Sequence, residues 1–253
     1  MHEEEFAHGR SLIHKLDPRL KIVMALAFSI IVAISTRYQV MLVALAGALV
    51  ITAIARLSLS LVLKRMLIVN VFIFFIWVFL PFTTPGTKTA VVGPFTATRE
   101  GIHLAFQITL KSNAIALAGM TLLSTSSLVD LGHALSNLKV PNKLIQLFFF
   151  TVRYSYTVHE EYLRLKNALK VRCFRPRTRL HTYRTYAYMM ARLLLGSFER
   201  SGRILSAMKC RGFRNRFPVL KDMHFHSWDM LFVLMFLPFL LFLGIVQWTR
   251  ILL

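Results

Sequence analysis

Carboxylates are scarce in this 253-residue chain, which has 11 Asp and Glu against 31 Lys and Arg and a formal net charge of +20. None of the 11 lies in the middle of a long apolar stretch, so an enzyme acting within a membrane would lack paired acids. The pattern Gly-x-x-x-x-Gly-Lys-Ser/Thr is absent, and we expect no nucleotide-binding loop. We predict no catalytic residue and no cofactor.

Cysteine is rare too. Cys173 and Cys210 are too few for a thiolate zinc site, and both fall in a segment assigned below to the cytoplasm, where a structural disulfide is not expected. His224 and His226 are spaced i, i+2 and do not share a helix face. We interpret these histidines as solvated side chains and predict no metal site.

Apolar residues, by contrast, make up 56% of the chain, and the mean hydropathy is +0.57. A membrane span needs ~20 apolar residues. Five stretches come near this length: Leu20–Thr36, Val40–Ala55, Met66–Phe82, Ile102–Leu123 and Trp228–Trp248. Lys111 lies within the fourth stretch, where it either pairs with an acid or reaches toward one interface. A signal peptide begins with a basic n-region, but this sequence has Glu3, Glu4 and Glu5 there, so no cleaved signal peptide is expected.

The placement of Lys and Arg predicts the orientation. With a cytoplasmic N-terminus, 26 of the 31 basic residues lie on the inside, as the positive-inside rule favours. The resulting domains are a cytoplasmic segment 1–19, four transmembrane helices within 20–123 with an external loop 83–101, a cytoplasmic module 124–227 and a fifth span 228–248. Thr, Val and Phe around Gly93-Pro94 predict a small β-hairpin in the external loop.

Capping residues mark helix starts in the first span and in the cytoplasmic module. Asp17-Pro18 is typical of an N-cap followed by proline at the first helical position, which would place Arg19 and Lys21 at the headgroup level. Ser127 and Asp130 resemble a capping box, which starts a short helix that ends near Leu138.

Two long helices follow in the module. No proline or glycine interrupts residues 142–174, which predicts a rod of about 50 Å, and a second helix runs from His181 to Lys209 with Gly212 as its C′ residue. The predicted fold class is therefore all-α, a polytopic membrane protein with about five transmembrane helices and a module of two long helices.

A repeat at an offset of 39 residues stands out in this module. RLKNALKVRCFRPR at 164–177 aligns with RILSAMKCRGFRNR at 203–216. In each copy an apolar residue, an alanine, a second apolar residue and an arginine share one helix face: Leu165, Ala168, Leu169 and Arg172, then Ile204, Ala207, Met208 and Arg211. Two equal helix ends suit a partner that is itself two-fold, such as a dimer with one groove per subunit.

The excess of basic residues leaves other partners open. Residues 128–227 hold 19 basic and five acidic side chains. This charge attracts anionic membrane lipids, and a basic helix end could simply rest on the lipid surface. Nucleic acid would be another acidic partner, but no recognised nucleic-acid module accompanies the charge. We therefore expect the chain not to bind nucleic acid.

At these residues the chain resembles the transmembrane T component of energy-coupling-factor (ECF) transporters, most closely the CbiQ/NikQ type. That family carries an Ala-Arg-Gly motif at the end of each of two cytoplasmic coupling helices. The second copy here reads Cys210-Arg211-Gly212 and the first reads Val171-Arg172-Cys173, so both depart from the motif at Ala and the first also lacks Gly. The string from Gly9 to Lys21 resembles the family's entry into its first span.

The resemblance implies a scaffold without enzymatic activity in the plasma (inner) membrane of a prokaryote. Its partners would be an ATP-binding ABC ATPase dimer, a membrane substrate-binding S component and a small accessory membrane subunit. The implied ATPase-docking residues are Ala168, Arg172, Ala207, Met208, Arg211 and Gly212. The implied cargo is cobalt or nickel, held by the S component; a vitamin transporter of the biotin type and a basic lipid- or nucleic-acid-binding hairpin are the alternatives.

Overall fold

The computed structural model describes residues 12–92, 95–138, 140–213 and 227–248. The chain forms two compact units, one of residues 1–134 with 222–253 and one of residues 135–221. The N-terminal string Gly9–Ser11, the predicted turn at Gly93-Pro94 and the pair His224 and His226 lie outside the described residues.

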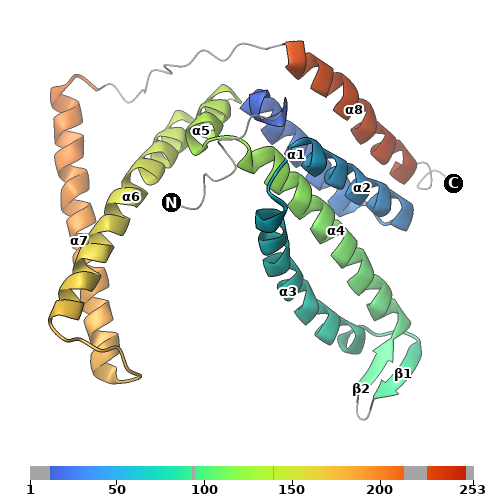
Figure 1. Cartoon of the computed structure of the whole chain (residues 1–253), viewed down its shortest axis with the longest axis horizontal. Helices are drawn as coiled ribbons and strands as arrows, with labels where there is room; N and C mark the ends of the chain where they lie inside the picture. Colours follow the sequence, from blue (N-terminus) through green and yellow to red (C-terminus); the bar gives the residue numbers. More distant parts are fainter. Residues whose placement is uncertain (1–11, 93–94, 139, 214–226, 249–253) are drawn as a thin grey trace. The chain divides into compact units, whose positions relative to one another are not determined.

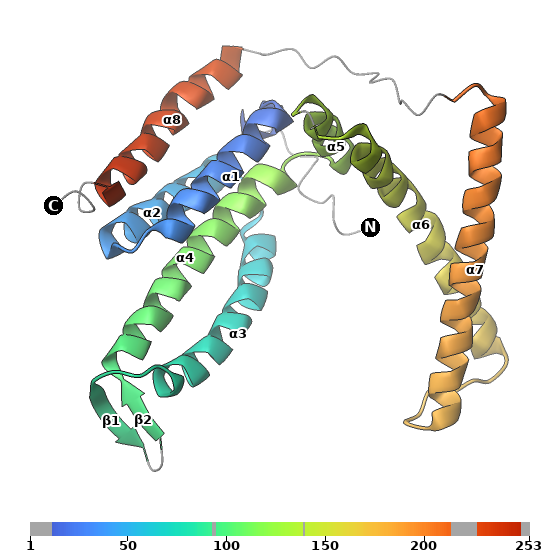
Figure 2. The same cartoon turned by 180° about the vertical axis from the view of Figure 1, so that it is seen from behind.

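The first unit is a bundle of apolar helices (Figure 1). Its elements are a 3-10 turn Leu12–Lys15, α1 Pro18–Ile34, α2 Tyr38–Ile54, α3 Leu59–Thr83, β1 Lys88–Val92, β2 Phe95–Thr98, α4 Arg99–Ser124, the start of α5 Leu128–Asn137, and α8 Ser227–Trp248. Figures 1 and 2 show α1, α2 and α4 side by side, with α3 bowed along α4 and the hairpin at their far end. The predicted β-hairpin is thus present, as an antiparallel pair.

Small side chains bring the central helices together. Ala44 and Ala48 of α2, Ala118 and Leu122 of α4, and Phe28 of α1 are fully buried in one apolar cluster. Alanine lets helix backbones approach closely, which suits helices packing within lipid. The outer surface of the bundle is apolar in turn: α3 exposes large hydrophobic side chains on most of its length.

The predicted fold class, an all-α polytopic membrane protein, is confirmed. By length and composition α3 and α8 can each cross a membrane, and α4 with α5, which are bent by 95° at their break, count as a third if the pair is one span. The apolar helix α2 is shorter, at 17 residues. The count of five spans and the orientation stay predictions.

Polar side chains join α3 to α4. The amides of Asn70 and Asn113 exchange hydrogen bonds of 3.1 and 3.2 Å, and the Trp77 indole N–H donates to the Thr109 hydroxyl at 2.9 Å. Because lipid offers no competing partner, such bonds help to hold a helix that buries little of its own surface.

The predicted caps of α1 and α5 are present. Asp17 accepts the Arg19 backbone N–H at 2.9 Å and Pro18 is the first residue of α1. At α5 the Ser127 hydroxyl accepts the Asp130 backbone N–H at 3.0 Å and donates to the Asp130 carboxylate at 2.8 Å. The side chain of Lys21, which we expected at the headgroup level, is fully buried within the protein.

Lys111 has a partner that the sequence did not indicate. Its ammonium donates to the backbone carbonyl of Ala33, in the last turn of α1, at 2.9 Å. The partner that the described residues provide is therefore a helix-end carbonyl and not an acid. A cation at a helix C-terminus satisfies an orphan carbonyl and complements the helix dipole.

The second unit consists mainly of two long helices, α6 Asn142–Val171 and α7 Leu180–Cys210. Their starts and ends agree with the predicted helices within three residues. The ring of Phe174, in the turn between them, packs against His181 and Tyr186 of α7. Buried side chains are few on both helices, with Ile145 on α6 and Thr182, Met189 and Leu193 on α7.

Candidate functional site

The two predicted arginines occupy the same position in their helices. Arg172 is the C-cap of α6 and Arg211 is the C-cap of α7. Their backbone N–H groups close the last helical turn on the carbonyls of Ala168 and Ala207, each at 3.2 Å. The repeat in the sequence therefore corresponds to a repeat in the structure.

The turns after the two arginines are also the same. After α6, the N–H groups of Cys173 and Phe174 donate to Lys170 and Leu169 at 3.0 and 3.1 Å. After α7, the N–H groups of Gly212 and Phe213 donate to Lys209 and Met208 at 3.0 and 3.1 Å. Both pairs form a Schellman motif, in which the two residues after the cap satisfy the last free carbonyls.

This turn requires a left-handed residue directly after each arginine. Gly212 has φ +76° and Cys173 has φ +56°. The absence of glycine from the first copy therefore does not change the backbone, although a side chain in this region costs roughly 1–2 kcal/mol. Both arginines emerge from the same rigid turn.

The side chains around the arginines repeat the same pattern of exposure. Ala168 and Arg172 are exposed on α6, as are Ala207 and Arg211 on α7. The apolar residues of each face, Leu165 and Leu169 or Ile204 and Met208, are half-buried. Within the part of the chain that the structure describes, neither arginine forms an ion pair. Each guanidinium is therefore available to a partner.

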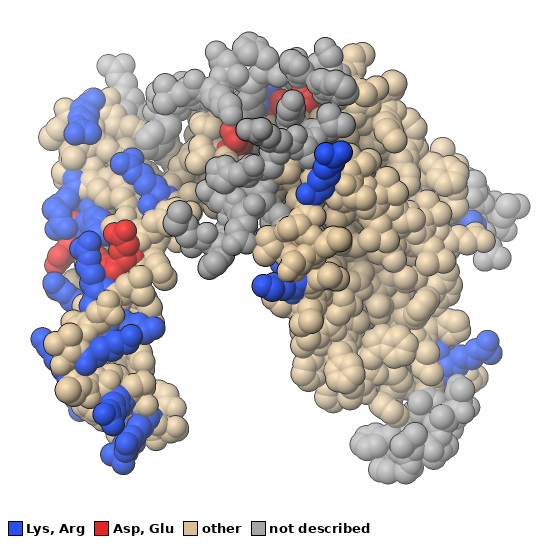
Figure 3. All heavy atoms as spheres, viewed as in Figure 1, with Lys and Arg blue, Asp and Glu red and all other residues tan. Residues whose placement is uncertain are grey.

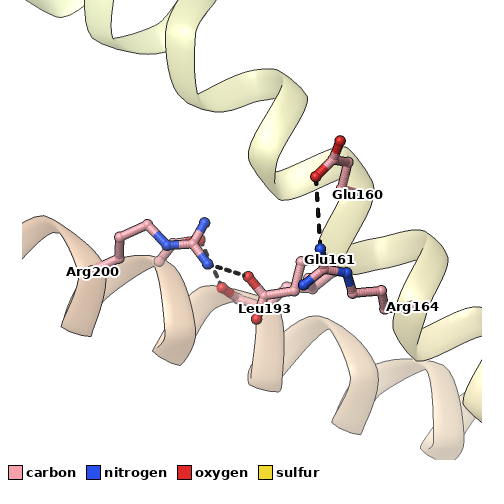
Figure 4. Close-up of polar contacts among 6 residues, drawn as sticks. Glu160, Glu161, Arg164, Leu193 and Arg200 are labelled. Carbon is pink, nitrogen blue, oxygen red and sulfur yellow. Dashed lines mark hydrogen bonds and ion pairs between the residues drawn. The ribbon is translucent and has the colours of Figure 1, made fainter.

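One ion pair ties the two helices together. Figure 4 shows the Glu161 carboxylate of α6 pointing to the Arg200 guanidinium of α7, at 2.7 Å. Both side chains are less than a third exposed, at 27% and 29%. Gly196 leaves room for this contact, because a Cβ there would lie 3.2 Å from a Glu161 carboxylate oxygen.

The position of this pair follows the repeat. Residues 161 and 200 are separated by the same 39 residues as Arg172 and Arg211, so equivalent positions of the two copies contact each other. Each tip lies 11 residues beyond the contact, about 16 Å along its helix. Sequence reasoning missed this pair, and the constant offset was the signal that could have found it.

The six predicted site residues thus form two matching sets on different helix ends. Ala168 and Arg172 end α6, while Ala207, Met208, Arg211 and Gly212 end α7. Figure 3 shows Lys and Arg side chains gathered over the surface of these two helices. Among the described residues no group of three or more His, Cys, Asp or Glu could hold a metal ion.

Comparison with known proteins places the chain in a family. Residues 9–220 match the family model described as cobalt transport protein, CbiQ. The chain belongs to this family. It is 29% identical over 216 residues to the energy-coupling factor transporter transmembrane protein EcfT of Heliobacterium modesticaldum, with 81% of this chain and 80% of that protein covered.

Other CbiQ-family relatives are similarly distant. The EcfT protein of Brevibacillus brevis is 25% identical over 221 residues, with 83% of each chain covered. An uncharacterized protein of Methanocaldococcus jannaschii is 25% identical over 251 residues, covering 95% of this chain and 91% of its own. This CbiQ-family chain is thus a membrane T component of an ECF transporter, a transport protein rather than an enzyme.

Proposed function

We propose that this chain is the coupling subunit of an ECF-type ABC importer and that its two helix ends each dock into one subunit of an ATPase dimer. The observation that carries the proposal is the duplicated, identically capped helix end with an exposed arginine. Two equal ends on one chain fit a two-fold partner that offers the same groove twice.

The chemistry of each end suits a narrow acidic groove. The small side chains of Ala168 and Ala207 allow a partner helix or loop to come close, one turn before each arginine. A guanidinium there can bind a carboxylate through two parallel hydrogen bonds. Because the Schellman turn fixes the backbone, little backbone entropy is lost when the arginine binds.

Transmission of movement would use the helices as levers. The Glu161–Arg200 pair supports this role, because it joins α6 and α7 at equivalent positions and leaves equal arms to the two tips. When the ATPase dimer closes, its two grooves approach each other. The parts of α6 and α7 between the ion pair and the helix ends would then rotate about the Glu161–Arg200 contact. Rigid helices then pass the movement toward the membrane helices.

The remaining parts of the proposal concern the membrane partners and cargo. The apolar outer surface of the first unit would hold the S component, with the N-terminus and the second unit in the cytoplasm. Cobalt or nickel is the cargo that the match to a cobalt transport family supports. A vitamin such as biotin is the second candidate, since the EcfT relatives carry a name that specifies no metal.

The test is copurification of the ATPase with Arg172→Ala, Arg211→Ala and the double variant. Truncating one member of a desolvated charge pair costs roughly 2–5 kcal/mol, so each single change should weaken ATPase binding about 30-fold or more. Arg→Glu at both tips should abolish assembly and uptake, because acidic grooves would repel the new carboxylates.

Arg164→Ala and Arg203→Ala are the matched controls, since these exposed arginines are also related by the repeat but lie eight residues before the tips. They should bind the ATPase within about twofold of the wild type. Wild-type yield of ATPase with the double Arg→Glu variant, together with normal uptake, would exclude docking through these residues.

A further inference from the structure

Lys21 is among the largest fully buried side chains that the structure describes, although it carries a charge. An ammonium is removed from water at such a site only if protein groups replace the water. The three hydrogen bonds that Lys21 forms all go to one place, the break between α4 and α5. Its position therefore calls for an explanation at that break.

The bonds hold both sides of the corner. The Lys21 ammonium donates to the Thr125 carbonyl at 3.4 Å, to the Thr125 hydroxyl at 3.2 Å and to the Ser126 hydroxyl at 2.9 Å. Thr125 is the C-cap of α4, and α5 begins two residues after Ser126. One side chain of α1 thus binds the end of α4 and the turn at which the chain bends by 95°.

Carboxylates from three elements complete the surroundings. Asp17 precedes α1, Asp130 lies in the first turn of α5 and Asp229 in the first turn of α8, and each attracts the Lys21 charge. The Asp229 carboxylate also accepts the Asp17 backbone N–H at 2.8 Å. The cluster therefore connects α1, α5 and α8 at the same end of the bundle.

A second lysine forms the opposite contact between the same helices. Lys111 of α4 donates to the Ala33 carbonyl in the last turn of α1, as Lys21 of α1 donates to the C-cap of α4. The two antiparallel helices therefore cap each other. Only Lys21, however, lies at the corner from which the chain continues into α6.

We propose that Lys21 is a positioning residue that sets the angle of the α4–α5 corner and so the direction in which the coupling helices leave the membrane bundle. The second half of this statement rests on the proposed coupling function, and the first half does not. Without Lys21, the carbonyl of Thr125 and the nearby carboxylates lose their common partner, and α5 is free to turn relative to α4.

The experiment measures the corner directly in the full chain. Spin labels are attached to cysteines placed at Ile30 of α1 and Val129 of α5, which are both exposed, after Cys173→Ser and Cys210→Ser. In Lys21→Met the distance distribution between the labels should become at least twice as broad. Lys21→Arg, which keeps the charge, should retain the wild-type mean, and Lys111→Met, the matched control, should retain the wild-type width.

A weaker substitution and a transport measurement complete the test. If Lys21→Met does not fold, Ser126→Ala removes the 2.9 Å bond alone and should still broaden the distribution. In the assembled complex, Lys21→Met should keep ATPase binding but lose at least tenfold in uptake per ATP hydrolysed. The proposal is overturned if the distance distribution of Lys21→Met, or of Ser126→Ala where Lys21→Met does not fold, is the same as that of the wild type. If the wild-type chain does not bind the ATPase at all, that result counts against the proposed function instead.

Discussion

At the scale of single residues, the two helix ends reach one backbone geometry with different residues. Gly212 adopts a positive φ at little cost in free energy, while Cys173 adopts it although its Cβ makes that region unfavourable. Nothing lies within 4 Å of a Cβ added to Gly212, so any penalty for a side chain there comes from the backbone and not from a clash.

This difference predicts opposite effects of two substitutions. Gly212→Ala should destabilise the turn after α7 by about 1 kcal/mol, and Cys173→Gly should stabilise the turn after α6 by a similar amount. Hydrogen exchange at the Phe213 and Phe174 amides, which close the two turns, would measure both as roughly fivefold changes in protection.

Gly202→Ala provides the matched control. Gly202 lies inside α7 with nothing within 4 Å of an added Cβ, so alanine should stabilise the helix by about 0.5–1 kcal/mol. Equal effects of alanine at positions 202 and 212 would show that the left-handed turn is not the cause.

Residue patterns also explain what the sequence could and could not predict. Pro18, Ser127 and Gly212 act on neighbouring backbone groups, so the helix starts and stops they indicated agree with the structure. The burial of Lys21 could not be predicted, because its partners lie 104 residues or more along the chain and a basic residue at the start of a span is usually interfacial.

At the scale of elements, a partly buried ion pair joins α6 and α7. Glu161 and Arg200 are close and moderately shielded, so we expect a coupling energy of about 1 kcal/mol in a double-mutant cycle of Glu161→Gln and Arg200→Gln. Spin labels on the native thiols Cys173 and Cys210 should report a broader separation of the two tips in either variant.

The pair Glu160 and Arg164 is the internal control for this cycle. Its charged atoms are 3.9 Å apart on α6, and the side chains are 69% and 82% exposed. Its coupling should be at most about 0.5 kcal/mol, and its removal should leave the tip separation unchanged. If the coupling energy of Glu161 and Arg200 is no larger than that of Glu160 and Arg164, the Glu161–Arg200 pair does not join the helices.

At the scale of the whole molecule, the proposed topology places both helix ends in the cytoplasm and the β-hairpin outside. Cys173 and Cys210 are exposed and directly flank the two arginines. A membrane-impermeant maleimide should therefore leave them unlabelled in intact cells and should label them in inverted vesicles.

The external side needs a cysteine of its own. Pro85→Cys, at an exposed position of the loop that follows α3, should be labelled in intact cells when the two native cysteines are serine. Labelling of Cys210 in intact cells, or protection of the cysteine at position 85, would rule out the orientation derived from the basic residues.

The contact between equivalent repeat positions also bears on the origin of the chain. In a dimer of two identical helices, residues on the symmetry axis meet their own copies, so a glutamate would face a glutamate and an arginine an arginine. Joining two copies in one gene removes that restriction, because each copy can then mutate independently. Glu161 opposite Arg200 is an attraction between equivalent repeat positions that two identical copies could not form.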